Sequence, residues 1–336
     1  MKTGKISESV LKRSVLRLIE NSRKEVIKGA GVGEDCAFLT WEDSDRTQGR
    51  SIVAASTETV SLPVRNSAYL AVMAAANNLA ASGAVPLSVS LSLTLPEDTE
   101  ETALKELMKQ AGKCCKELAI QITGGHTEVS RSVKAPVVTA TVIGKVKEEF
   151  TGSAGGTGAD NLDVVISKWI GLEGTSIIAR EKEEELSQRY PIRLIRDAQE
   201  MDGYLSVASE AAIALKSGVY TMHDARSGGI FGALWEISRR IGVGLYIDLK
   251  KIPVKQETIE ICEFYHLNPY ALLSGGTLVM LTSDGRGLVR DLEAEGIPAV
   301  IVGNTNKSND KVIMSKDETR YLEPAGPDEI LKISFI

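Results

Sequence analysis

The sequence predicts two domains: an α+β domain over residues 1–151, followed by an α/β domain over residues 152–336. With 336 residues, the chain is long enough for two hydrophobic cores of ordinary size. A glycine-rich stretch at residues 152–158 reads either as a linker or as a β-turn loop, and we take it as the domain boundary. Strand-like and helix-like segments alternate on both sides of it, which is typical of folds that layer sheets with helices.

The first elements are read from hydrophobic periodicity. Apolar residues at helical spacing predict a helix over residues 5–21, followed by a glycine loop at residues 29–33. Residues 52–55 read as a short buried strand. Residues 67–82 are rich in alanine and apolar on most sides, which predicts a buried helix with Gly83 as its C-cap.

The segment Leu87–Leu95 is the clearest strand, because leucine and valine alternate with serine and threonine without interruption. Its hydroxyl face either packs against another sheet or subunit or is exposed to solvent. Residues 98–101 then open a helix in the manner of a capping box, and this helix reaches Leu118. Strands at residues 119–123 and 136–146 complete the first half.

Strands and helices alternate again in the second half. Helices are expected to begin near Gly171, to cover residues 203–216, and to end near Ile241. The predicted strands cover residues 162–167, 219–222, 243–247, 277–282 and 298–302.

Composition limits the classes of function. The net charge of −6 argues against a nucleic-acid partner, which would require a basic face. No apolar run approaches the roughly 20 residues that span a bilayer, and the N-terminus lacks the apolar core of a signal peptide. The four cysteines form no Cys-x-x-Cys pair, and the adjacent Cys114 and Cys115 read as helix packing. Free thiols are typical of a reducing cytoplasm, where we expect this protein.

Four polar motifs in the first half follow apolar segments, where a fold can gather polar groups around a ligand. Glycines allow backbone N–H groups to approach an anion, and carboxylates bind hard cations, so together they suggest a site for phosphate with magnesium. The motifs are Gly31-Val32-Gly33-Glu34-Asp35, Ser56-Thr57-Glu58, Asn77-Asn78-Leu79-Ala80 and Gly124-Gly125-His126-Thr127-Glu128.

Each motif also has a structural interpretation. Glu34 and Asp35 alone read as a solvated turn, and Asn77 and Asn78 either cap local backbone or face a polar cleft. His126 is as consistent with a structural role as with a functional one.

Two segments of the second half are also candidates for ligand binding. Residues 171–175 resemble a helix N-terminus that receives an anion, or an ordinary capped helix. Residues 223–229 read as a polar loop between a strand and a helix.

Several common sites are excluded. Residues 29–33 lack the preceding strand and the long following helix of a dinucleotide-binding turn. The chain has no Gly-Lys-Ser/Thr of a P-loop, no zinc-type histidine spacing and no Gly-x-Ser-x-Gly elbow.

In their order and spacing, these motifs resemble the AIR synthase (PurM-like) superfamily over nearly the whole chain. Gly124–Val129, Trp169–Thr175 and Met222–Gly229 look most like its hydrogenase maturation factor-like (HypE-related) branch. The resemblance implies a PurM-like α+β N-terminal domain, whose sheet forms a homodimer, and a PurM-like α/β C-terminal domain. It also implies ATP in the cleft between them, magnesium, and phosphorylation or activation of a small acceptor.

By this resemblance, Asp35 and Glu58 hold magnesium, and Asp35 and His126 are the candidate catalytic residues. The candidate nucleotide-binding residues are glycines and short polar residues. They are Gly31, Gly33, Asn77, Asn78, Gly124, Gly125, Thr127, Gly171, Gly174 and Thr175.

The chain departs from the family pattern at acidic positions. The family usually has Asn-Asp where this chain has Asn77-Asn78, and Gly-Asp-Thr where it has Gly125-His126-Thr127, although histidine is the usual form in the HypE-related branch. We therefore expect weak or altered magnesium binding, and the alternative function is a nucleotide-binding regulator or assembly factor without catalysis. The C-terminal cysteine of HypE proteins is also missing, so their cyano-forming reaction is not carried over.

Overall fold

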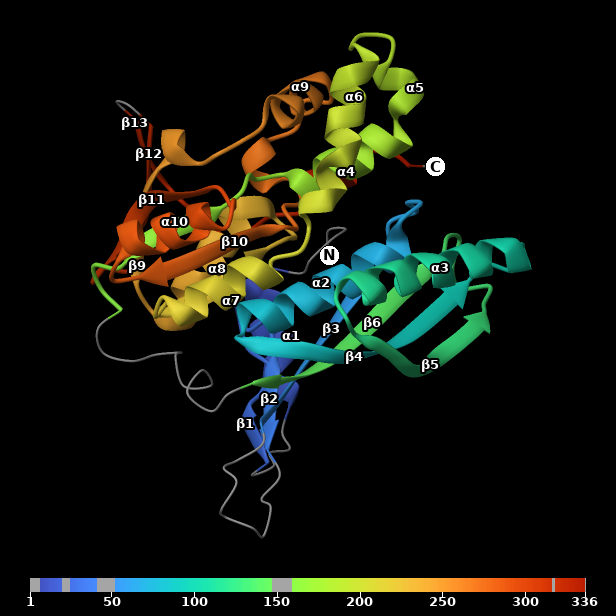
Figure 1. Ribbon diagram of the computed structural model, residues 1–336, viewed down its shortest axis with the longest axis horizontal. Helices are drawn as coiled ribbons and strands as arrows, with labels where there is room; N and C mark the ends of the chain where they lie inside the picture. Colours follow the sequence, from blue (N-terminus) through green and yellow to red (C-terminus); the bar gives the residue numbers. More distant parts are fainter. Residues whose placement is uncertain (1–6, 20–24, 41–51, 147–158, 316–317, 336) are drawn as a thin grey trace. The chain divides into compact units, whose positions relative to one another are not determined.

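The computed structural model describes residues 7–19, 25–40, 52–146, 159–315 and 318–335 (Figure 1). These residues form two compact units. Of the described residues, the N-terminal unit comprises 25–29, 35–40, 52–146 and 335, and the C-terminal unit comprises 7–19, 30–34, 159–315 and 318–334. The glycine-rich stretch 152–158 lies outside the described residues, and the domain boundary between residues 151 and 152 stays a prediction.

A six-stranded sheet forms the N-terminal unit, with the strand order β1-β2-β3-β6-β4-β5. All neighbouring strands are antiparallel except β4 and β5, which are parallel. The strands are β1 (Val26–Lys28), β2 (Ala37–Thr40), β3 (Ile52–Val60), β4 (Ala84–Leu95), β5 (Gln121–Val129) and β6 (Val137–Val146).

Two helices pack with this sheet, α2 (Ser67–Ala81) on strands β3, β4 and β6, and α3 (Glu101–Glu117) beside α2 and β5 (Figure 1). Every residue of α2 except Tyr69 is buried, as its alanine-rich sequence predicts. Gly83 has a φ of 75° just after the helix, which fits its predicted role at the C-terminus. The predicted capping box of α3 is wrong: the N-cap residue Glu100 makes no side-chain capping bond.

Two strands are longer than the sequence predicts. Strand β3 continues to Val60 because Ser56–Val60 pair with Val138–Val142 of β6. Strand β5 continues to Val129 because it pairs with Ser90–Leu95 of β4. The motifs around Glu58 and His126 therefore lie inside strands rather than after them.

Strand β4 has the predicted alternation from Ser88 onwards, with Val89, Leu91, Leu93 and Leu95 buried. Leu87 departs from it: the pairing with β6 shifts register at this residue, and Leu87 is 45% exposed. The opposite face carries hydroxyl groups of β3, β4 and β6. Of these, Thr57 and Thr141 approach to 3.0 Å, and Thr59 and Thr139 to 2.9 Å.

A seven-stranded mixed sheet forms the centre of the C-terminal unit, with the order β13-β12-β9-β11-β7-β10-β8. The pairs are antiparallel except β9 with β12. The strands are β7 (Asp163–Ser167), β8 (Thr221–Ala225), β9 (Gly244–Asp248), β10 (Thr277–Thr282), β11 (Ala299–Asn306), β12 (Lys311–Ser315) and β13 (Glu318–Tyr321).

Helix α8 (Gly229–Ile241) packs with the sheet in one apolar cluster, which contains Ile230, Leu234 and Ile237 of the helix together with residues of β7, β9 and β10. Helices α7 (Ala208–Lys216) and α10 (Gly285–Ala294) also pack on the sheet and on each other. The predicted alternation of strands and helices is confirmed. The prediction of a polar loop over residues 223–229 is wrong in its first part, because residues 223–225 belong to the buried strand β8.

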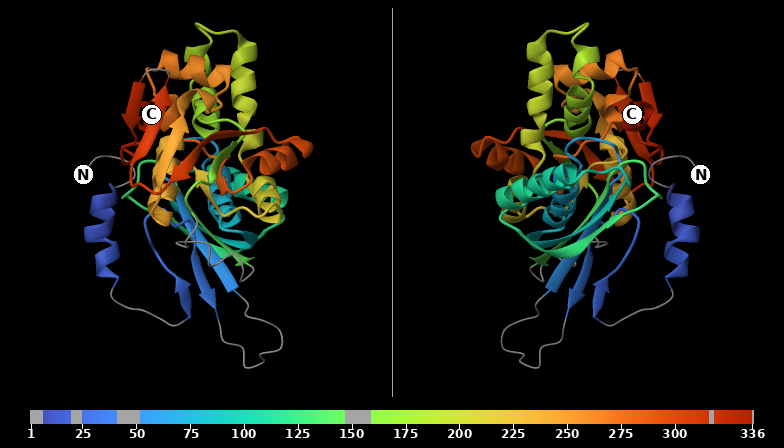
Figure 2. Two further views of the ribbon diagram at one scale, coloured as in Figure 1. Left: turned by 90° about the vertical axis from the view of Figure 1, so that its left-hand side faces the viewer. Right: turned by 90° about the vertical axis from the view of Figure 1, so that its right-hand side faces the viewer.

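A second group of helices lies beside this sheet and packs together at one end of the C-terminal unit (Figure 2). The helices are α4 (Leu172–Glu181), α5 (Glu183–Leu186), α6 (Ile192–Gln199) and α9 (Gln256–Phe264). Short 3-10 turns complete the unit. They are η1 (Leu16–Leu18), η3 (Glu200–Tyr204), η4 (Leu249–Lys251), η5 (Pro269–Ala271) and η6 (Glu329–Lys332).

The predicted N-terminal helix is shorter than expected in the described part, where α1 covers Glu8–Ser14. It belongs to the C-terminal unit, because Glu8 accepts a hydrogen bond from Trp235 (2.9 Å) and pairs with Arg239 (3.2 Å). All four cysteines are buried free thiols. In the part of the chain that is described, no helix has both the length and the apolar composition to cross a membrane.

Candidate functional site

One polar cluster of the N-terminal unit lies between α2 and β3. Asn78, 8% exposed on α2, donates from Nδ2 to Ser56 Oγ (2.9 Å) and to Glu58 Oε1 (3.0 Å). Ser56 and Glu58 are two positions apart on β3, so both side chains lie on the face that α2 covers. The fold thus joins two of the four polar motifs, and the amide of Asn78 faces a polar cluster rather than capping local backbone.

A third motif reaches the same helix. Cys36 directly follows the half-buried Asp35 and donates its thiol to the carbonyl oxygen of Asn78 at 3.4 Å. Asp35 is therefore one residue away from a direct contact with α2. Asn77, the neighbour of Asn78, is 3% exposed.

The glycines before Asp35 belong to the other unit. Gly31 and Gly33 lie in the segment 30–34 of the C-terminal unit. The carbonyl of Gly33 accepts a hydrogen bond from Arg240 of α8 at 3.2 Å. Its φ is 73°, and a Cβ there would approach the carbonyl oxygen of Glu236 to 2.5 Å, so this position requires glycine for packing.

The fourth motif lies apart from the other three within the N-terminal unit. His126 stands opposite Ser92 on the hydroxyl face, whereas Glu58 points toward α2 on the other face. The side chain of His126 is 70% exposed, and its Nε2 atom lies 3.6 Å from Glu128 Oε2. Strand β5 is three positions from β3 in the sheet order, a separation of about 14 Å at usual strand spacing.

Gly124, Gly125 and Thr127 lie on the same exposed edge strand as His126. Gly125 has a φ of 146°, and a Cβ there would lie 1.8 Å from the carbonyl oxygen of Leu91. At Gly124 an added Cβ would meet no atom within 4 Å. Gly125 therefore allows the close pairing of β4 and β5, while Gly124 has no steric requirement of this kind.

Helix α4 begins at the predicted anion-binding segment, but its N–H groups are engaged inside the protein. The N–H of Gly171 donates to Ser274 Oγ (2.9 Å), and that of Gly174 donates to the carbonyl oxygen of Leu273 (2.9 Å). Thr175, fully buried, donates its hydroxyl to Thr258 Oγ1 at 2.9 Å. An anion that binds these three residues would have to displace these internal hydrogen bonds. In this structure the three residues instead fix the start of α4 to the neighbouring segments.

A second polar cluster lies at the edge of the sheet where β7 and β8 end and β10 begins. Glu173, 3% exposed, pairs with Arg226 at 3.1 Å. Asp328 accepts N–H bonds from Gly228 (2.7 Å), Leu273 (3.1 Å) and Ile330 (2.9 Å). Burial raises the pKa of Asp328 to about 6, with a further increase from Glu173, although the three hydrogen bonds act in the opposite direction.

Neither Arg226 nor Asp328 is among the site residues that the sequence predicts. Arg226 lies in the polar segment 223–229, where a charged side chain between small residues is a usable signal. Asp328 is 100 residues from Gly228, and nothing in the local sequence indicates that they meet.

A buried lysine was also missed. Lys168, just after β7, has a φ of 54° and donates from Nζ to the carbonyl oxygens of Tyr204 (2.8 Å) and Ser206 (2.6 Å). It also pairs with Glu210, and both side chains are less than 10% exposed. Burial lowers the pKa of Lys168, and Glu210 offsets part of this effect. The pair anchors the chain before α7 to the central sheet.

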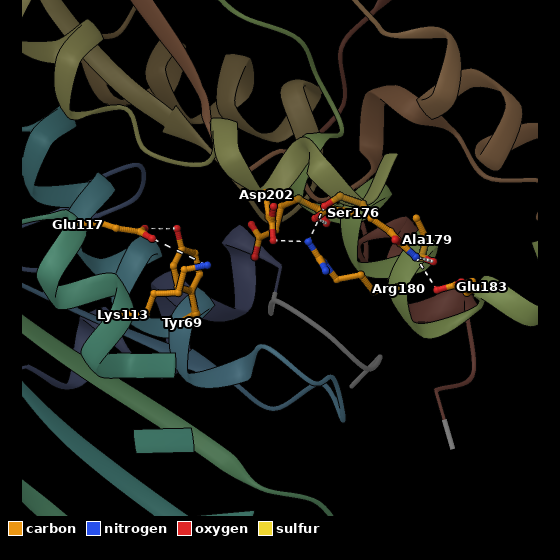
Figure 3. Close-up of polar contacts among 10 residues, drawn as sticks. Tyr69, Lys113, Glu117, Ser176, Ala179, Arg180, Glu183 and Asp202 are labelled. Atoms are coloured by element: carbon orange, nitrogen blue, oxygen red, sulfur yellow. Dashed lines mark hydrogen bonds and ion pairs between the residues drawn. The ribbon is translucent and has the colours of Figure 1, made fainter. Parts of the chain in front are cut away.

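Surface contacts support the helices around the two clusters (Figure 3). In the N-terminal unit, Tyr69 of α2 donates to Glu117 of α3 at 2.7 Å, and Lys113 lies 5.5 Å from the Tyr69 ring centroid. In the C-terminal unit, Arg180 of α4 pairs with Asp202 and donates to the carbonyl oxygen of Gln199 at 2.7 Å. These contacts hold α2 against α3 and α4 against η3.

Two family models match the chain. The model described as "AIR synthase related protein, N-terminal domain" matches residues 33–146, and "AIR synthase related protein, C-terminal domain" matches residues 160–316. The chain is 24% identical over 315 residues to the "Putative hydrogenase expression/formation protein" of Methanocaldococcus jannaschii, covering 93% of this chain and 91% of the relative.

Solved structures share the fold. A crystal structure of a HypE–HypF complex contains a chain that matches with a TM-score of 0.72 and 21% identity, over 94% of this chain and 99% of that one. HypE in complex with ATP matches with a TM-score of 0.68 and 17% identity, over 98% of each chain.

Proposed function

Because the chain belongs to the AIR synthase related family, we propose that it binds ATP and uses it to activate a small acceptor in hydrogenase maturation. The relative from M. jannaschii carries a hydrogenase expression/formation name, and a HypE protein of the same fold binds ATP. The observation that carries the proposal is the contact between Asn78 and Glu58, which joins two of the candidate site motifs.

The residues of this cluster fit magnesium in chemical kind. Magnesium prefers oxygen ligands, and Glu58 and Asp35 supply carboxylates. Asn78 adds a carbonyl oxygen, since its Nδ2 already donates to Ser56 and Glu58. With an amide at position 78, the set carries one negative charge fewer than the family pattern, so we propose that Asp35 and Glu58 hold the ion weakly.

The phosphate groups would contact exposed backbone. We propose that Gly124, Gly125 and Thr127 bind phosphate, because β5 is an edge strand whose outer N–H groups do not pair with β4. His126 is exposed beside them and fits a role in charge neutralisation during phosphoryl transfer. On the acceptor side, we propose the loop Arg226–Gly228, where the Glu173–Arg226 pair lies.

A homodimer is part of the proposal. The hydroxyl face of the N-terminal sheet remains open among the described residues of its own unit, and edge strand β5 is exposed. His126 and Glu58 occupy opposite faces of that sheet, so a second copy would allow the two residues to serve one ligand from different chains. A mixed dimer of Asp35→Ala and His126→Ala chains then regains ATP turnover that each variant alone lacks. No recovery on mixing would contradict a shared site.

Thermal unfolding with ATP tests the central proposal. ATP with magnesium should raise the melting temperature more than ATP alone, and Asp35→Ala should abolish both this difference and ATP turnover. Glu106→Ala, which removes an exposed carboxylate from α3 of the same unit, is the matched control. Turnover that survives in Asp35→Ala would disprove the metal assignment.

A nucleotide-binding regulator without catalysis is the second candidate. The neutral residues Asn78 and His126 favour it, because they stand where most of the family carries acids. It predicts that ATP stabilises the protein equally with and without magnesium and that no turnover occurs. The cytoplasmic location stays a prediction; the four buried free thiols suit a reducing compartment.

A further inference from the structure

Asp328 is the meeting point of three segments that are distant in the sequence. Its Oδ2 accepts the N–H of Gly228, which precedes α8. Its Oδ1 accepts the N–H groups of Leu273, which precedes β10, and of Ile330 in η6. The residue is 7% exposed, so these bonds are shielded from water.

The two loops that Asp328 joins also bond to each other. The carbonyl oxygen of Arg226 accepts the N–H groups of Gly229 (3.0 Å) and Ser274 (3.2 Å). Strand β8 ends and β10 begins at this edge of the sheet, because the two strands are antiparallel neighbours. The carboxylate of Asp328 thus holds a loop pair that the sheet has already brought together.

The C-terminal segment before Asp328 lies over a cavity. The cavity has a volume of about 510 Å³, with residues 320–327 on one side and the stacked rings of Phe231 and Tyr270 on another. The N–H of Leu322 donates to the carbonyl oxygen of Lys311 (2.8 Å) at one end of the segment, and Asp328 anchors the other end. With a cavity beneath it, the segment depends on these anchors for its position.

The loop and the segment are also in steric contact. Gly228 has a φ of 84°, and a Cβ there would approach Ala325 Cβ to 2.9 Å. A displacement of the C-terminal segment would therefore remove both a hydrogen bond and a packing contact from Gly228.

We propose that Asp328 is a positioning residue: it fixes the loop Arg226–Gly228 to the C-terminal segment, so that the loop is ordered only while this segment is in place. This inference deepens the proposed function and rests on it in one respect, the placement of the acceptor at this loop. The charged groups around Asp328 are Glu173 and Arg226, which neutralise each other, and Glu329, which pairs with Lys332.

Hydrogen exchange tests the proposal without requiring any activity. In Asp328→Asn, an NH₂ group replaces one acceptor oxygen, and the amides of Gly228, Leu273 and Ile330 should exchange about tenfold faster. The matched control is Glu329→Gln, whose carboxylate accepts the N–H of Asn268 instead and should leave the Gly228 amide unchanged. Faster exchange at Ile330 alone would overturn the proposal, because Asp328 would then only cap its own 3-10 turn.

A second variant approaches the same contact from the loop. Gly228→Ala pushes against Ala325 and should accelerate exchange at Leu322 and Ile330, although it leaves Asp328 intact. An effect confined to the loop would contradict the coupling, and this holds even if Asp328→Asn does not fold.

Enzyme kinetics separate a positioning role from general stability. Asp328→Asn should lower the kcat of ATP turnover about tenfold while the melting-temperature shift with ATP stays unchanged, because the phosphate and magnesium ligands proposed above belong to the N-terminal unit. An unchanged kcat together with accelerated exchange at all three amides would contradict the link to the acceptor. If the wild-type protein has no turnover, the proposed function fails while the exchange result still decides the coupling.

Discussion

The substitution Asn78→Asp would test how this chain tolerates an amide at a position where its family usually has an acid. The Nδ2 atom of Asn78 lies 3.0 Å from Glu58 Oε1, so the variant replaces a hydrogen bond with two facing carboxylates. Two unit charges 3 Å apart repel by about 5 kcal/mol at an effective dielectric constant near 20. Solvent at the half-buried Glu58 and proton uptake by the pair reduce this repulsion.

We therefore expect Asn78→Asp to lower the free energy of unfolding by about 2 kcal/mol in EDTA at pH 7. Magnesium at millimolar concentration should restore most of this loss, because an ion between the carboxylates replaces repulsion with coordination. The measurement is urea unfolding with and without magnesium.

The control for this experiment is Asn78→Ala. It loses the bonds to Ser56 and Glu58 and should cost about 1 to 2 kcal/mol, without recovery in magnesium. If Asn78→Asp is as stable as wild type in EDTA, the side chains of residues 78 and 58 are not in contact in solution. If magnesium restores nothing, the cluster is not a cation site.

Three further substitutions test the structure by urea or thermal unfolding. Lys168→Met leaves the buried carboxylate of Glu210 without its cation and should lower the free energy of unfolding by about 3 kcal/mol. Adding Glu210→Gln in the same chain should recover part of this loss, and an equal loss in the double variant would contradict the pairing. Because burial raises the pKa of Asp328 from 3.8 to about 6, its contribution to stability is fully present below pH 4 and is lost as the pH rises through 6, by about 3 kcal/mol in total. Asp328→Asn should lack this part of the pH dependence, and an identical pH profile would refute the shift. Gly125→Ala should cost about 2 to 3 kcal/mol through backbone strain and a clash with β4, whereas Gly124→Ala should cost under about 1; equal effects would refute the close approach at Gly125.

The two polar clusters, one around Asn78 and one around Asp328, differ in the number of charged groups that they contain. The Asn78 cluster joins an amide, a hydroxyl and a carboxylate, and only the carboxylate carries charge. The Asp328 cluster contains two buried carboxylates, of which Glu173 pairs with the guanidinium of Arg226 and raises the pKa of Asp328. Removing Arg226 would leave the buried carboxylate of Glu173 without its cation, so we expect Arg226 to tolerate substitution less well than Asn78.

Much of the secondary structure follows from the sequence because it depends on local periodicity. The alternation in β4 and the alanine-rich sequence of α2 predict a half-buried strand and a fully buried helix, and both are observed. Strand ends were harder to predict. The polar residues 56–58 read as the end of β3, but Thr57 and Thr59 each contact a threonine of β6, and the backbone pairing with β6 continues to Val60.

The sequence by itself determined that there are two layered units, and that oxygen-bearing side chains lie beside glycines in motifs of a known family. Only the tertiary structure decided which of these residues meet. Sheet order and strand register are set by pairing over long distances, so they place Glu58 beside Asn78 and put His126 on the opposite face, three strands away. The contact of Asp328 with Gly228 arises in the same way, because 100 residues of intervening sheet and helix bring together two groups that carry no local signal for each other.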